Sequence, residues 1–176
     1  MRIGRPERRS LLAAHQGEAA ILFSVCEYLF AISAGAVAEI QSLRGLRPLP
    51  VTRIPHPPSK VKHILEREQR TYFVVESNQH FHLPATRSTR LLLLRDAPVA
   101  VKVDAIERMS EIERIIPLPG AFSGEERDWY RGLALTGSRV VPAVNPAAFL
   151  SRVEQQLLER ILATKRSEPE RAGVLV

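Results

Sequence analysis

Apolar positions recur along this chain at a constant spacing of 69 residues, the difference between positions 117 and 48. Pro48-Leu49-Pro50 returns at that spacing as Pro117-Leu118-Pro119. Without a gap, the same offset places Leu22 on Leu91, Ala31 on Ala100 and Ile40 on Met109. Solenoid repeats have periods of about 20 to 50 residues, so this longer spacing predicts two similar halves packed against each other, about 20–84 and 89–150. Chance agreement between two β-rich segments is the alternative.

Each half begins with a pattern typical of a strand pair. Residues 21–26 and 28–32 in the first half, and 90–95 and 98–103 in the second, are rich in apolar residues. Runs such as 91–94 are apolar on both faces, as in strands that are buried on two sides. An amphipathic segment follows in each half, over 36–43 and 105–112. Apolar residues lie three positions apart in this segment, which fits either one or two helical turns or a strand with a bulge.

Each half closes with a predicted hairpin. In the second half, strands over 131–135 and 139–144 flank Thr136-Gly137-Ser138, where glycine supplies the positive φ of a tight turn. In the first half, strands over 61–66 and 70–76 flank Arg67-Glu68-Gln69, which lacks glycine and predicts a wider turn. Many short strands with turn signals at this spacing predict an all-β fold of barrels or sandwiches.

The chain ends differently, in a predicted helix and tail over 151–176. Asn145-Pro146 has the residue types of a helix start. An apolar stripe at helical spacing follows, which predicts a helix docked on the barrels. The stripe consists of Phe149, Leu150, Val153, Leu157, Ile161 and Leu162.

Composition adds constraints on location and partners. The formal net charge is +6, and part of the excess lies in a basic N-terminal extension, residues 1–17. Aromatic residues make up only 6% of the chain and the other arginines alternate with carboxylates, so no nucleic-acid partner is predicted. Residues 19–38 carry a single charge, but their second copy contains Arg95, Asp96 and Lys102, which argues against membrane insertion. We expect a cytoplasmic protein, and the lone cysteine fits a reducing compartment.

Histidines offer the one candidate for metal chemistry. His80 and His82 flank Phe81, so on a strand both would point to one face, with His63 or Glu76 as a further ligand. A small metal-dependent β-barrel enzyme is therefore one alternative. The simpler interpretation is two polar residues around a buried phenylalanine. No phosphate-binding loop, nucleophile elbow or defensible acid pair is present, so we predict no catalytic, metal or cofactor residues.

The order of elements resembles the CheW-like chemotaxis coupling proteins, of which this chain would be a divergent member. The resemblance rests on residues 36–40 and Val74-Val75-Glu76 in the first half. In the second half it rests on residues 101–104 and on the closing block from 130 to 150. It covers about 20–150 and is a distributed pattern. It implies a CheW-like domain over 18–150, built of two intertwined, five-stranded, SH3-like barrels with short helical connections and a C-terminal helix.

The resemblance also implies a function. Members are non-catalytic adaptors without cofactors, which link the cytoplasmic tips of chemoreceptors to the regulatory domain of a CheA-type histidine kinase. The matching segments make Val37, Glu39, Val101, Val103 and Asp104 candidate partner-binding residues. The three valines could stand at the surface or in the groove between the modules, and the alternative is that all three are core.

One departure from the family pattern affects the predicted partner surface. The family's first module carries an Asn-Leu-Arg-Gly-like motif before its Val-Val-Asp strand, and the equivalent positions here are Glu66-Arg67-Glu68-Gln69. Either the turn has shifted by one residue or a partner surface has changed. Arg67 and Glu68 are therefore candidate partner-binding residues, and a scaffold for a different protein partner is the second hypothesis.

Overall fold

The computed structural model describes residues 17–50 and 56–167. The predicted N-terminal extension, apart from Gly17, and the tail from residue 168 lie outside the described residues. The first half contributes β1 (Glu18–Val25), β2 (Tyr28–Ser33), η1 (Ala34–Ala36), β3 (Val37–Ser42), β4 (Leu46–Pro48), β5 (Val61–Arg67), β6 (Arg70–Glu76) and α1 (Ser77–His80). The second contributes β7 (Arg90–Leu94), β8 (Val99–Val103), β9 (Ala105–Ile112), β10 (Arg114–Ile116), η2 (Gly124–Trp129), β11 (Tyr130–Thr136), β12 (Arg139–Val144), η3 (Pro146–Ala148) and α2 (Arg152–Arg166).

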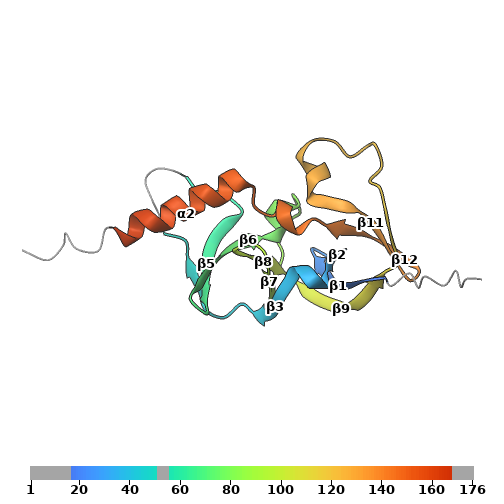
Figure 1. The fold of residues 1–176 in the computed structure, drawn as a ribbon, viewed down its shortest axis with the longest axis horizontal. Coiled ribbons are helices and arrows are strands. Elements are labelled where there is room, and N and C mark those ends of the chain that lie inside the picture. The colour runs from blue at the N-terminus through green and yellow to red at the C-terminus, as the bar shows by residue number, and fades with distance from the viewer. Residues whose placement is uncertain (1–16, 51–55, 168–176) are drawn as a thin grey trace, which may run out of the picture.

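The strands form two six-stranded sheets that exchange strands between the halves. The sheet we call barrel 1 has the order β3-β7-β8-β6-β5-β4, and barrel 2 has the order β10-β11-β12-β2-β1-β9. Each therefore takes four strands from one half and two from the other. Replacing every strand by its counterpart in the other half converts one order into the other. The two barrels lie side by side along the long axis of the molecule (Figure 1), and the predicted all-β fold of two intertwined SH3-like modules is confirmed.

A bent strand closes each barrel. Only Glu113 separates β9 from β10, yet these strands occupy opposite edges of the same sheet. Similarly, three residues separate β3 from β4, and these two strands occupy opposite edges of the other sheet. Counted as one bent strand each, they give the five strands predicted per module.

The amphipathic segments after the first hairpins are bulged strands rather than helical turns. Ala38 of β3 has no paired residue in β7, and Glu107 of β9 has no paired residue in β1. In the same way, Lys62 of β5 has no paired residue in β6, and Arg131 of β11 has none in β12. A β-bulge adds one residue to one strand and is a local feature of the backbone. Both pairs of bulges are 69 residues apart, which shows that the halves share a backbone and not only a composition.

The alignment without a gap is wrong in the first hairpin. The first hairpin is two residues longer than the second: nine positions separate Leu22 from its partner Ala31, whereas seven separate Leu93 from its partner Ala100. Leu22 pairs with Arg108 and Leu93 pairs with Glu39, so Leu93 is the counterpart of Leu22 rather than Leu91. An insertion of two residues preserves the strand period of two. The apolar pattern therefore matched even in the wrong register.

The turn between β5 and β6 is tighter than predicted. Arg67 pairs with Arg70, which leaves Glu68 and Gln69 as a two-residue turn with φ angles of 49° and 64°. Hairpins favour such turns because their twist matches that of the strands, even without the usual asparagine and glycine. Cys26 and Glu27 have the same backbone form, at 49° and 67°. Cys26 is therefore a half-buried turn residue.

Burial divides the interior into three cores. A small core fills each barrel, and every buried residue of the barrel 1 core has a buried counterpart in barrel 2, such as Ala100 and Ala31. The third and largest core lies between the barrels. Several strands are thus covered on both faces, which explains apolar runs such as 91–94.

The C-terminal helix begins later than predicted. Asn145 caps only η3, where its side-chain oxygen accepts a hydrogen bond from the Ala147 amide at 3.1 Å. Ser151 and Glu154 then form a capping box that starts α2. Leu158 and Ile161 are fully buried, whereas Val153 of the predicted stripe is 75% exposed. The helix is docked as expected, but on a face that includes Leu158.

Candidate partner-binding surface

The three candidate valines are core residues, and their expected surface position is wrong. Val37 is 6% exposed, and Val101 and Val103 are fully buried. All three belong to the large core between the barrels. Both faces of β8 are covered there. These valines position surface elements and do not themselves present an accessible apolar group.

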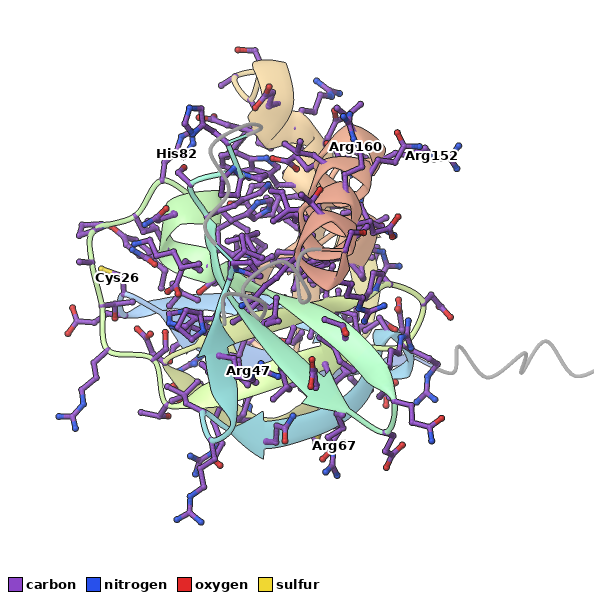
Figure 2. The ribbon with its side chains drawn as sticks, turned by 90° about the vertical axis from the view of Figure 1, so that its left-hand side faces the viewer. Cys26, Arg47, Arg67, His82, Arg152 and Arg160 are labelled. Carbon is purple, nitrogen blue, oxygen red and sulfur yellow. The ribbon has the colours of Figure 1, made fainter. Side chains whose placement is uncertain are left out.

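Glu39 and Arg67 are brought together at the surface. The Arg67 guanidinium donates from Nε and Nη2 to the two carboxylate oxygens of Glu39, at 3.0 and 2.9 Å. The pair joins β3 to the end of β5, and this bidentate contact raises the pKa of Arg67 above its usual value. Ile40, beside Glu39, is 39% exposed. In Figure 2, Arg67 lies at the opposite end of the view from Arg152 and Arg160 of α2.

The hairpin in which the family motif is replaced keeps an arginine at this surface. Arg67 is the last residue of β5, and Glu68 follows it in the exposed turn. The arginine therefore faces Glu39 although it lies one residue away from the expected register. The structure does not test whether Arg67 or Glu68 contacts a partner, and both stay predictions.

Asp104 has a structural role in this chain. Its carboxylate accepts hydrogen bonds from the Cys26 amide at 2.7 Å and from the Thr86 hydroxyl, and its own amide donates to the Ser24 carbonyl at 2.9 Å. Asp104 thus joins the β1–β2 turn to the segment between the halves. A partner contact by its carboxylate stays a prediction, and it would compete with these bonds.

The strand geometry behind the metal hypothesis is wrong. His80 ends α1, and His82 follows in a left-handed conformation at a φ of 54°. His80 is buried against the rings of Phe81, Trp129 and Phe149, whereas His82 is exposed. Within residues 17–50 and 56–167, no group of three or more possible ligands could hold a metal ion.

His80 stays neutral because it is buried. Burial lowers its pKa to about 3, and the charges of Lys60 and His82 act in the same direction. Lys60 Nζ lies 3.4 Å from His80 Nδ1 and 3.3 Å from a carboxylate oxygen of Glu154 on α2. A neutral imidazole can accept a hydrogen bond from the lysine ammonium group, so His80 and Lys60 help to connect α1 to the C-terminal helix.

We expect His80 to make stability depend on pH. Between its folded pKa of about 3 and the ordinary value of 6.5, the unfolded chain binds a proton that the folded chain does not. This contribution to stability is complete above pH 6.5 and is lost as the pH falls, by about 2 kcal/mol between pH 7 and 5. Denaturant unfolding of His80→Phe should show a smaller loss over this range. His82→Asn, the control, should keep most of the pH-dependent loss of stability. If His80→Phe lost as much stability between pH 7 and 5 as the original protein, the assignment to His80 would be contradicted.

A groove at the junction of the barrels is the surface that sequence reasoning missed. Two adjoining hollows share Ala97, Pro146 and Ala147, and extend from η1 along the β7–β8 turn to the first turns of α2. We call this surface the junction groove. Its floor is apolar and its rim is polar; the floor includes Ala36, Leu94, Ala97, Val99, Pro146 and Leu150, and the rim Asp96, Asn145, Arg152, Gln155, Gln156 and Glu159. These residues come from three distant segments, so no local motif identifies them.

An apolar floor with a polar rim is the usual anatomy of a protein–protein interface. The hollows measure about 240 and 570 Å³. They are open clefts rather than enclosed cavities.

Among the described residues, no helix is long and apolar enough to span a membrane.

Comparisons with known proteins agree with this architecture. The scaffolding protein TtCheW from Thermoanaerobacter tengcongensis has a similar structure, with a TM-score of 0.60 at 18% sequence identity, covering 73% of this chain and 89% of that one. At this identity the similarity shows a shared fold. A search of curated protein sequences finds no match. The family model of the CheW-like domain matches residues 19–154, which is most of the chain. The chain therefore belongs to the family of CheW-like domains.

Proposed function

We propose that this protein is a non-catalytic, cytoplasmic adaptor that couples chemoreceptor tips to the regulatory domain of a CheA-type histidine kinase. The match of residues 19–154 to the CheW-like domain is the observation that carries the proposal. The intertwined barrels add a rigid body with two similar ends, which suits a protein that holds two partners at once.

The junction groove is our proposed site for one of these partners. Its apolar floor can receive anchoring side chains, and a few such anchors usually supply most of the binding energy. Glu39, Arg67 and Glu68 form a second, charged surface on barrel 1, for the other partner.

Co-sedimentation tests the coupling function. Purified protein should pellet with assembled receptor cytoplasmic fragments and should carry the kinase regulatory domain into the pellet with it. Ala97→Glu, at the half-exposed centre of the junction groove, should abolish one of these interactions and leave the melting temperature unchanged. Ala163→Glu, at an exposed position of α2, is the matched control. A protein that pellets with neither partner would contradict the proposal.

Exchange of the Glu39–Arg67 charges should show whether a partner contacts this pair. In Glu39→Arg/Arg67→Glu the ion pair can form again and stability should change little, since exposed pairs contribute little. Binding should nevertheless fall, because the partner meets reversed charges. The control exchanges Glu18 and Arg131, a similarly exposed pair on barrel 2 with contacts of 2.8 and 2.9 Å. Full binding by the first double variant would assign the pair a purely internal role.

A second candidate function keeps the fold but changes the partner. It is favoured by the turn between β5 and β6, where Glu68 and Gln69 replace the residue types of the family motif. Affinity purification from the native cells separates the two functions. Recovery of a receptor and a histidine kinase supports coupling, and recovery of a different protein, reduced by Glu68→Lys, supports the alternative.

A further inference from the structure

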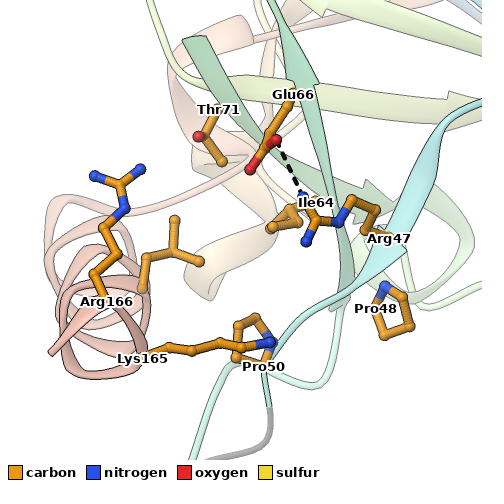
Figure 3. A pocket seen from close by; sticks show the side chains of 9 residues that line it. Arg47, Pro48, Pro50, Ile64, Glu66, Thr71, Lys165 and Arg166 are labelled. Atoms are coloured by element: carbon orange, nitrogen blue, oxygen red, sulfur yellow. Dashed lines mark hydrogen bonds and ion pairs between the residues drawn. The ribbon is translucent and has the colours of Figure 1, made fainter. Parts of the chain in front are cut away.

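A groove between α2 and barrel 1 is distinct from the surfaces proposed for coupling. Its floor is apolar and consists of Ile64 of β5, Leu162 of α2 and the prolines Pro48 and Pro50 (Figure 3). The groove measures about 210 Å³ and is open to solvent. A helix with its side chains is about 10–12 Å wide, so this volume suits individual side chains of a partner rather than a whole helix.

The walls of this groove are basic. Arg47 stands on the strand side, and Lys165 and Arg166 stand on the helix side (Figure 3). Glu66 is the one carboxylate in the lining, and Arg47 already pairs with it at 3.1 Å. Lys165 and Arg166 form no ion pair with any residue in the described part of the chain. The groove therefore combines an apolar floor with two cations that pair with no carboxylate among the described residues.

Barrel 2 lacks the charged residues of this groove. On barrel 2 the positions of Arg47, Glu66 and Thr71 are occupied by the apolar residues Ile116, Leu135 and Val140. The helix side of the groove, with Leu162, Lys165 and Arg166, also lies beyond residues 19–154 that match the family. The groove thus distinguishes the two similar barrels, and it is built in part by residues outside the shared domain.

We infer that this basic groove binds a short acidic peptide segment of a partner protein, with an apolar side chain between its carboxylates. The apolar side chain would contact Ile64 and Leu162, and the flanking carboxylates would meet Lys165 and Arg166. Complementary charges of this kind fix the register of a partner and exclude basic ones. The inference does not rest on the coupling function, because its test contains neither a receptor nor a kinase.

Fluorescence anisotropy with three labelled peptides tests the inference on the full chain. The probes are a hexapeptide of the pattern Glu-Glu-Leu-Leu-Glu-Glu, the same peptide with lysine in place of glutamate, and an acidic peptide with serine in place of leucine. The first should bind the most tightly. Lys165→Glu/Arg166→Glu should weaken its binding about tenfold or more, since reversing two charges at the rim removes attraction and adds repulsion.

The control reverses two exposed charges that lie outside the groove. Arg114→Glu/Arg160→Glu changes the net charge equally, and neither residue lines the basic groove or the junction groove. Arg160 is labelled on α2 in Figure 2. This double variant should leave affinity for the peptide nearly unchanged. Equal weakening by both double variants, or equal binding of the lysine peptide, would overturn the inference. Binding that appears only in Glu168→Lys/Glu170→Lys would also overturn it, because the chain's own acidic residues would then be the occupant.

Discussion

Val101→Asp is expected to remove a large part of the protein's free energy of unfolding. Val101 is fully buried in β8, which lies between β6 and β7 at the centre of barrel 1. An aspartate there would place an unpaired carboxylate in the large core, at a cost of roughly 4 kcal/mol or more. Domains have a total stability of about 5–15 kcal/mol, so this loss is a large fraction of the total. Circular dichroism during denaturant unfolding measures the effect.

Val153→Asp is the matched control for this substitution. Val153 is 75% exposed in the first turn of α2, where a carboxylate is favoured by the helix dipole. Its free energy of unfolding should stay within about 0.5 kcal/mol of the original protein. If Val101→Asp instead folded with normal stability and lost only partner binding, the surface role first expected for this valine would be correct after all.

Leu158→Ala is expected to lower stability by about 3 kcal/mol, because it leaves a cavity beneath the C-terminal helix. Leu158 and Ile161 are fully buried and anchor α2 to the large core. The loss should appear as a lower denaturant midpoint with an unchanged slope, as for a helix that unfolds together with the barrels.

A smaller residue on the exposed side of the same helix should have little effect. Val153→Ala removes apolar atoms from α2 without opening a cavity, and alanine has the higher helix propensity. A midpoint for Leu158→Ala equal to that of Val153→Ala would mean that α2 does not stabilise the barrels. That result would also weaken the case for the basic groove, since α2 forms one of its walls.

The repeat predicted the fold well because hydrophobic periodicity reports backbone geometry. The pairs at positions 31 and 100, and 40 and 109, are structural counterparts, and both bulges of each half recur at the predicted offset. The error at Leu22 arose because a strand has a period of two, so a slip of two residues keeps the same face inside. Apolar pattern alone cannot detect such an insertion.

The candidate site was predicted less well, for a physical reason. Val37, Val101 and Val103 were assigned from chain neighbours, but strand exchange buries all three side chains in the core between the barrels. Glu39 and Arg67 were chosen separately, and only the fold shows that they form one ion pair. The junction groove joins three distant segments, and no pattern in any one of them marks it.

Strand exchange also sets the order in which the molecule can be assembled during synthesis. Barrel 1 uses the contiguous stretch from β3 to β8, residues 37–103, whereas barrel 2 joins β1 and β2 to strands that end at residue 144. Contacts between distant segments form slowly, since a long loop must close before they are made. On the ribosome, barrel 1 is therefore free to form first. The apolar β1–β2 hairpin must wait for β9 to β12 to emerge, and it is the segment that most needs protection from aggregation.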